Sequence, residues 1–103
     1  NNTSIFSIQN QFLNDQAYIL LENCSENNFE KLCISKIKKL SYSAQVILIH
    51  HWVFQLNQTI LNLRQIHEII KFFDATNDKN PLFEFNNVRI TKNRDWLLIK
   101  LQK

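Results

Sequence analysis

The chain has 103 residues, enough for one domain that buries about 65% of the surface its unfolded form exposes. With 45% apolar residues, eight phenylalanines and a net charge of +3, it can build a core and is not a disordered chain. Glycine is absent, which excludes the loops that cradle phosphates in nucleotide-binding proteins, and no stretch approaches the roughly 20 apolar residues of a transmembrane helix. We therefore expect a cytoplasmic protein that carries no cofactor on this chain and binds no membrane.

The beginning of the chain predicts a long helix followed by a short strand. Thr3 or Ser4 can cap a helix that runs to about Asn23, since apolar residues recur there at helical spacing. Lys31 to Ser35 places its apolar residues with a period of two and predicts a short strand. The chain contains no methionine and starts in a polar run. We expect residues 1–103 to be a single domain cut from a longer protein and monomeric by itself.

Two helix-forming runs follow, and the rest of the chain has to pack against them. Ala44 to Leu56, begun at Ser41 or Ser43, carries apolar residues on more than one side, as a central helix does. Leu63 to Phe73 has one apolar stripe and one wet face, and Asn62 precedes it with a glutamine three residues later, as in a capping box. The stripe consists of Leu63, Ile66, Ile70 and Phe73, with Ile69 beside it.

After Pro81, the single proline, the apolar period changes from that of a helix to that of a strand. Asparagines lie in the connections between the strands, and asparagine tolerates the positive φ for which glycine is otherwise used. The predicted strands are Leu82–Phe85, Val88–Ile90 and Trp96–Leu101. The sequence therefore predicts an α+β domain with a long N-terminal helix, a short strand, a helical pair and a three-stranded antiparallel sheet.

Charge is distributed unevenly along the chain. Residues 1–30 carry four acids and no base (−4), whereas residues 31–103 carry all 12 Lys and Arg against five acids (+7). A basic field of this kind attracts polyanions, although solvated surface without any partner has the same composition. Our candidates for contact with a phosphate backbone are Arg64, Lys71, Arg89, Lys92 and Arg94.

Each of these side chains also has a structural interpretation. Glu68 can pair with Arg64 and with Lys71 along the helix, for about 0.2–0.5 kcal/mol per pair. Arg89 alternates with two apolar residues and should lie on the outer face of the sheet. Basic residues on strands also serve to prevent strand-to-strand aggregation.

No group of side chains has the spacing of a catalytic or metal site. His50 and His51 point about 100° apart on a helix and cannot chelate one metal ion, so we expect one in the core and the other in water. Cys24 and Cys33 are expected to be free thiols, because a chain with a full core needs no disulfide. Both tryptophans are expected in the core, with a stacking platform as the alternative for Trp96.

Residues Ser43 to Lys100 resemble the substrate-binding domain that follows the catalytic domain in bacterial tRNA(Ile)-lysidine synthases. The resemblance is carried by HHWVFQL (50–56), by the helix LRQIHEIIKFF (63–73) and by the tail DATNDKNPLFEFNNVRITKNRDWLLIK (74–100). LCISKIKKLSYSAQ (32–45) fits the segment before them. His50 and His51 stand where the family has two arginines before a tryptophan, while Lys92 matches a basic position of the family, flanked here by Thr91 and Asn93.

The resemblance implies a function for the parent protein. Such an enzyme uses ATP, with magnesium, to ligate lysine to the wobble cytidine of an isoleucine tRNA. Its catalytic Ser-Gly-Gly-x-Asp-Ser loop belongs to an N-terminal domain, which is the expected partner within the same chain. The present chain would then be a tRNA-binding accessory domain without a catalytic site.

Two other interpretations use the same elements. Two helices followed by a hairpin also describe a winged-helix domain, in which Leu63–Phe73 would enter the major groove of DNA. A connection of about six residues is long for that motif, and Glu68 would face the phosphates. A structural or protein-docking module is the third interpretation.

Overall fold

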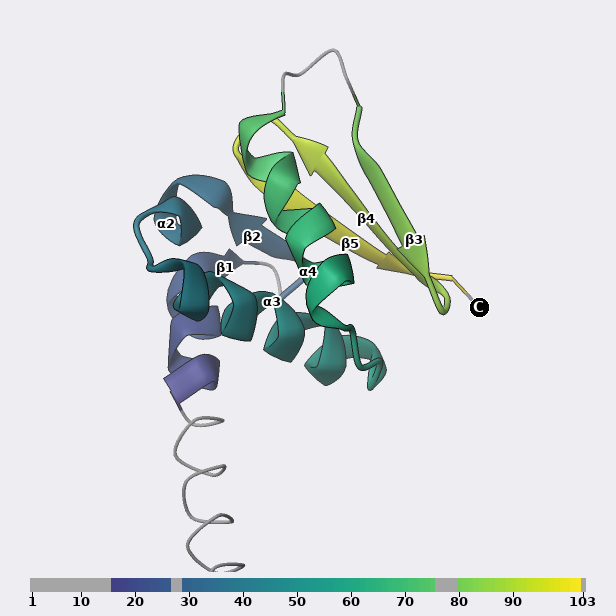
Figure 1. The fold of residues 1–103 in the computed structure, drawn as a ribbon, viewed down its shortest axis with the longest axis horizontal. Coiled ribbons are helices and arrows are strands. Elements are labelled where there is room, and N and C mark those ends of the chain that lie inside the picture. The colour runs from purple at the N-terminus through teal and green to yellow at the C-terminus, as the bar shows by residue number, and fades with distance from the viewer. Residues whose placement is uncertain (1–15, 27–28, 76–79, 103) are drawn as a thin grey trace, which may run out of the picture.

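The computed structural model describes residues 16–26, 29–75 and 80–102. They form one sheet of five antiparallel strands with helices packed against one of its faces (Figure 1). The predicted α+β class is thereby confirmed. Residues 16–24 are helical, and the predicted start of this helix at Thr3 or Ser4 lies outside the described residues. No helix within these three stretches is long and apolar enough to cross a membrane.

The sheet has two strands more than we predicted, in the order β1-β2-β5-β4-β3. The strands are β1 Ser25–Glu26, β2 Lys31–Cys33, β3 Leu82–Phe85, β4 Val88–Asn93 and β5 Trp96–Leu101. β2 joins the C-terminal strands because Leu32 pairs with Leu97, and β1, which we did not predict, pairs with β2. β4 is longer than predicted because it stays paired with β5 until Asn93 lies opposite Trp96. Pairing between segments so distant in sequence leaves no trace in local periodicity.

The predicted strand Lys31–Ser35 ends early, at Cys33, and α2 (Ile34–Lys38) begins there. This short helix has no side-chain cap from the residue before it. Instead, the backbone oxygen of Asp95 accepts a hydrogen bond from the backbone N–H of Ile34 at 2.8 Å, and the Asp95 carboxylate accepts one from the Ser35 hydroxyl at 2.5 Å. A contact from the turn between β4 and β5 therefore starts this helix.

The predicted helical pair is confirmed as α3 (Tyr42–Asn57) and α4 (Leu63–Ile70), with a 3-10 turn, η1 (Lys71–Asp74), continuing α4. The Ser41 hydroxyl accepts from the backbone N–H of Ala44 at 3.2 Å and caps α3. Asn62 and Gln65 form the predicted capping box, with distances of 2.8 and 2.9 Å.

The core lies between the helices and the sheet, and α3 is its centre. Trp52 is fully buried, as predicted, and its Nε1 donates to the backbone oxygen of Phe29 at 2.6 Å. The residues buried around it are Leu48, Ile49 and Val53 of α3, Ile66 and Ile69 of α4, and Val88, Ile90, Leu97 and Ile99 of the sheet. The prediction for Leu63 was wrong: it is 60% exposed, because α4 turns Ile66 and Ile69 toward the core and Leu63 lies in its first turn, away from that side.

The turns work without glycine. Asn86 and Asn87 have φ of 53° and 68°, the two left-handed residues of a type I′ hairpin turn between β3 and β4. Asparagine in this turn was predicted. In the turn between β4 and β5 the left-handed residue is Arg94, at φ 58°, and not its asparagine neighbour. A side chain with a Cβ atom is strained in this conformation, so the arginine is held there by its surroundings.

We predict that Asn87→Gly stabilises the fold by a few tenths to about 1 kcal/mol, because Asn-Gly is the preferred pair for a type I′ turn and glycine removes the Cβ contact at positive φ. The Asn87 backbone oxygen, which accepts from the N–H of Gln102 at 2.7 Å, is unchanged by this substitution. Urea unfolding of the two proteins measures the difference.

Asn93→Gly is the matched control. Asn93 lies in β4 and has no left-handed φ, so glycine there should cost about 0.5–1 kcal/mol. Equal effects of the two substitutions would contradict the interpretation of the turn.

Candidate nucleic-acid interface

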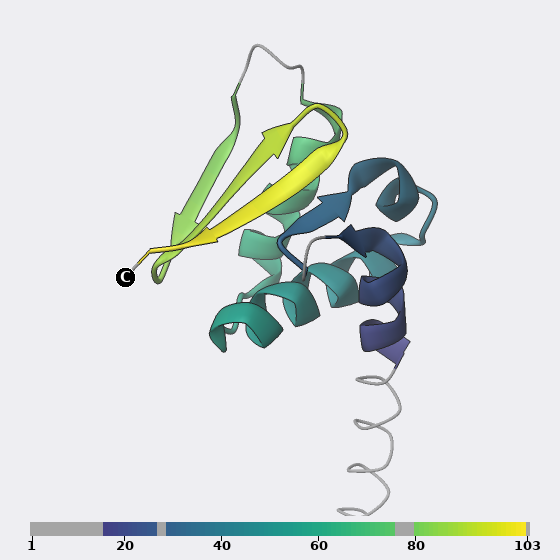
Figure 2. The same cartoon turned by 180° about the vertical axis from the view of Figure 1, so that it is seen from behind.

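The sheet has one covered and one open face. Figure 2 shows the face that lies away from α3 and α4. Val88 and Ile90 are buried beneath the helices, so Arg89 between them belongs to the open face, as predicted. The register places Glu84 of β3 and Lys100 of β5 directly on either side of Arg89. The middle of the open face is therefore a row of charged residues.

Arg89 is paired within this row. Its guanidinium lies 3.3 Å from the Glu84 carboxylate, and the two side chains are 43% and 47% exposed. An ion pair this accessible to solvent is worth about 0–1 kcal/mol. Arg89 can therefore exchange Glu84 for a phosphate at little cost.

Lys92 and Arg94 lie together at the end of the sheet where β4 turns into β5. They line a polar hollow of about 480 Å³, together with Asn80, Thr91, Asn93 and Leu98. The Lys92 ammonium donates to the backbone oxygen of Ala75, which directs this side chain toward the end of η1. Among the described residues, those that line this hollow include two cations, three groups with neutral hydrogen-bonding side chains and no carboxylate. Such a hollow suits an anion.

Asp95 holds the turn that carries Arg94. Besides the bonds to Ile34 and Ser35, its carboxylate accepts from the Cys33 thiol at 3.4 Å. The hydrogen bond from the Ser35 hydroxyl, helped by the thiol, lowers the pKa of Asp95. Asp95 thus fixes the position of Arg94 from the neighbouring residue, and sequence reasoning missed this role because Cys33 and Ser35 are distant in the chain.

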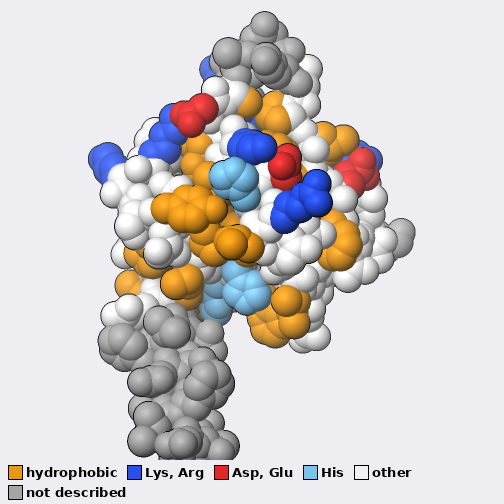
Figure 3. Space-filling model, in the orientation of Figure 1, with side chains coloured by type: hydrophobic (Ala, Val, Ile, Leu, Met, Phe, Trp, Pro, Cys, Tyr) orange, Lys and Arg blue, Asp and Glu red, His pale blue; other side chains and the backbone are white. Residues whose placement is uncertain are grey.

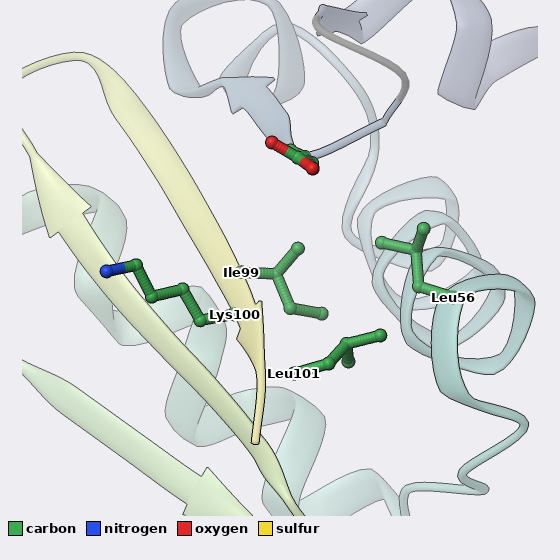
Figure 4. Close-up of a pocket in the computed structure, with 5 residues that line it drawn as sticks. Leu56, Ile99, Lys100 and Leu101 are labelled. Carbon is green, nitrogen blue, oxygen red and sulfur yellow. The ribbon is translucent and has the colours of Figure 1, made fainter. Parts of the chain in front are cut away.

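A second hollow, of about 440 Å³, lies between the end of α3 and β5 and is lined by Glu30, Leu56, Ile99, Lys100 and Leu101. In Figure 4, Leu56, Ile99 and Leu101 face one another, whereas the Lys100 side chain points away from them. Its lining is apolar with a carboxylate at the edge, so it does not suit a phosphate. The same view shows that Lys100 extends toward the open face of the sheet.

Arg64 and Lys71 lie elsewhere. Both are exposed and belong to the helical layer, on the opposite side of the sheet from Arg89 (Figures 1 and 2). Figure 3 shows this side, where basic, acidic and histidine side chains lie among apolar ones. Glu68 pairs with Lys71 at 3.3 Å, which is one of the two predicted pairs along the helix. The five predicted residues therefore belong to two surfaces, and only Lys92 and Arg94 share a hollow.

The prediction for the adjacent histidines was wrong. His50 and His51 are both half-buried, and neither lies in the core. Successive residues diverge by about 100° on a helix, so the two rings lie at opposite edges of the buried side of α3, and each is partly covered. Burial of the ring, and then the nearby His50, lower the pKa of His51, whereas a hydrogen bond from the imidazole to the Gln55 side chain raises it. His50 stacks on Phe54 with 6.3 Å between ring centroids.

The described residues contain no group of three His, Cys, Asp or Glu side chains that could hold a metal ion. Cys24, which is buried, and Cys33, which is half-buried, are free thiols. The third histidine, His67 on α4, lies 3.3 Å from the Tyr42 hydroxyl. These side chains make local contacts between elements.

Trp96 is half-buried on the open face, so the prediction of a core position holds only in part. The Lys31 ammonium lies 5.5 Å from the centre of its ring. Sequence reasoning missed Lys31 as a neighbour, and it treated Thr91 and Asn93 only as departures from a basic motif. Strand alternation places Thr91 and Asn93 on the same face as Arg89, and this was the available sign that they belong to the surface.

A family model described as the TilS substrate binding domain matches residues 32–98, which is more than half of the chain. The matched region runs from β2 into β5 and includes every residue that lines the basic hollow. No protein with a curated description matches the chain. The fold and this match define a substrate-binding domain of a tRNA-modifying enzyme.

The chain belongs to the TilS substrate-binding domain family, the C-terminal domain of tRNA(Ile)-lysidine synthase. The resemblance found in the sequence is thereby confirmed. The match also replaces the winged-helix interpretation, because the helical pair and the strands are explained by one family.

We predict that Asp95→Asn lowers the thermal stability of the fold at pH 7. The folded-state pKa of Asp95 is depressed, so its contribution is present above the unfolded pKa and is lost as the pH falls through the folded pKa. The gap in melting temperature between Asp95→Asn and the unchanged chain should therefore narrow from pH 7 to pH 3. Thermal unfolding followed by circular dichroism measures both values.

Asp74→Asn is the control. Asp74 pairs with Lys38 at 2.8 Å, but its side chain is 86% exposed, so its loss should cost at most about 1 kcal/mol. A gap for Asp95→Asn that stays constant with pH would show that the carboxylate charge is not what matters.

Proposed function

We propose that this chain is the tRNA-binding accessory domain of a lysidine synthase, the ATP-dependent ligase that attaches lysine to the wobble cytidine of an isoleucine tRNA. The family match over residues 32–98 carries the proposal. The hollow lined by Lys92 and Arg94, which lies within the matched region, supports it.

We assign to this chain the holding of the RNA and none of the bond-forming steps. The sequence has no glycine for a phosphate-cradling loop, so we place ATP, magnesium and the activated cytidine on a separate catalytic domain of the parent protein. The domain would act as a monomer beside that catalytic domain, in the cytoplasm where tRNA is modified.

The primary contact is the end of the sheet. Arg94 offers a positive charge at the hollow, and Arg89 adds a second from an exposed ion pair on the open face. Lys92 also lines the hollow, and its ammonium, which donates to Ala75, adds a third charge toward the end of η1. Phosphate contacts of this kind position RNA without reading its sequence. Arg64 and Lys71 provide a secondary contact on the helical side, where Glu68 already neutralises part of the charge.

A reading helix for duplex DNA fits the same residues less well. Gln65, which would face the bases, is used in the capping box with Asn62, and Glu68 would lie against the phosphate backbone. The alternative of DNA recognition through α4 therefore has no support from its contacts.

We predict that the chain binds isoleucine tRNA with a CAU anticodon more tightly than duplex DNA, and that affinity falls with salt with a log-log slope of about −0.7 to −0.9 per neutralised phosphate. Lys92→Gln and Arg94→Gln should each weaken binding and reduce the magnitude of the slope by the amount that corresponds to about one neutralised phosphate. Both substitutions keep a side chain that can form hydrogen bonds, so a loss of affinity measures the contribution of the positive charge. Fluorescence anisotropy titrations at several salt concentrations, with an unrelated tRNA for comparison, provide the measurement.

Arg64→Gln makes the same change of charge on the helical side and should have a smaller effect. Unchanged tRNA affinity in Lys92→Gln and Arg94→Gln would remove the hollow from the interface. Tighter binding to duplex DNA than to tRNA would overturn the proposed function.

A further inference from the structure

An apolar strip runs along β5 on the open face of the sheet. Trp96 and Leu98 are two residues apart in this strand, so they lie on the same face, and both are half-buried. The open face here is covered by neither α3 nor α4 (Figure 2).

Cations flank this strip. Lys31, on β2, pairs with Leu98 across the strands, and its ammonium lies over the Trp96 ring. An ammonium over an indole face is a cation–π contact, and it shows that the ring face can be reached from the side on which Lys31 lies.

The strip continues into the basic hollow. Trp96 lies directly opposite Asn93, which lines the hollow, and Leu98 is itself part of the lining. An aromatic surface and a site for an anion are therefore neighbours, separated by a single cross-strand pair.

We propose that Trp96 and Leu98 form a stacking subsite for an unpaired nucleobase whose phosphate lies in the hollow beside Arg94, since Lys92 points to the other face of the sheet and donates to Ala75. The proposal rests on the proposed function, and it adds that the domain binds looped-out or single-stranded RNA in preference to a duplex. Paired bases are stacked on their neighbours and cannot reach a protein side chain, whereas unpaired bases stack on exposed aromatic rings. Asp95, whose Oδ2 accepts from Ser35 and Cys33, is not among the residues that line the hollow.

The test uses the complete chain and an eight-nucleotide oligoadenylate, alone and annealed to its complement. We expect tighter binding to the single strand, with quenching of tryptophan emission that is absent in Trp96→Leu. The affinity of Trp96→Leu should fall about 5- to 150-fold, the factor that corresponds to one lost base stack. Its salt slope should not change, because no phosphate contact is removed.

Trp96→Phe keeps a flat ring and should recover most of the affinity, which also provides a folded variant if Trp96→Leu is unstable. Tyr42→Leu is the matched control, since it removes a 50% exposed aromatic ring from the helical layer. It should leave the affinity for the single strand unchanged.

Three results would overturn the stacking subsite while leaving RNA binding in place: equal affinity for single strand and duplex, an unaffected Trp96→Leu, or quenching that persists in Trp96→Leu. Self-association that is lost in Trp96→Leu would assign the strip to a second copy of the chain and would also overturn it. No binding of the unchanged chain to tRNA or to the oligonucleotide would overturn the proposed function itself.

Discussion

Burial of α3 against one face of the sheet is the constraint on which the rest of the structure depends. Trp52 is fully enclosed there and is tied by its indole N–H to the backbone of Phe29, just before β2. Side chains alternate along a strand, so covering Val88 and Ile90 leaves Arg89 on the open face. The same packing event that builds the core therefore also decides which side chains are offered to a partner.

The basic character of the open face is local. Arg89 is paired with Glu84, whereas the hollow at the end of β4 is lined by Lys92 and Arg94 and, within the part of the chain that the structure describes, by no carboxylate. Asp95 supplies the adjoining negative charge, and its Oδ2 accepts hydrogen bonds from Cys33 of β2 and Ser35 of α2. In this turn, therefore, Asp95 holds the fold together, whereas the side chain of the adjacent Arg94 lines the hollow.

Many features of the fold could be predicted from the sequence, because they depend on local interactions. The cap at Ser41, the capping box of Asn62 and the asparagine turn at 86–87 involve residues within a few positions of one another. The place of Arg89 on the outer face followed from alternation alone. Prediction was wrong where a boundary depended on packing, as for the half-buried His50 and His51.

The α+β class, the helical pair, the C-terminal strands and the family could all be inferred from the sequence. Each of them follows from periodicity, capping residues or a motif. Only the tertiary structure joined β2 to β5 and thereby brought Asp95 to the start of α2 and Lys31 over Trp96. It also separated the five predicted basic residues into two surfaces. Such pairings join residues far apart in the chain, and they stabilise the fold only once the sheet has formed.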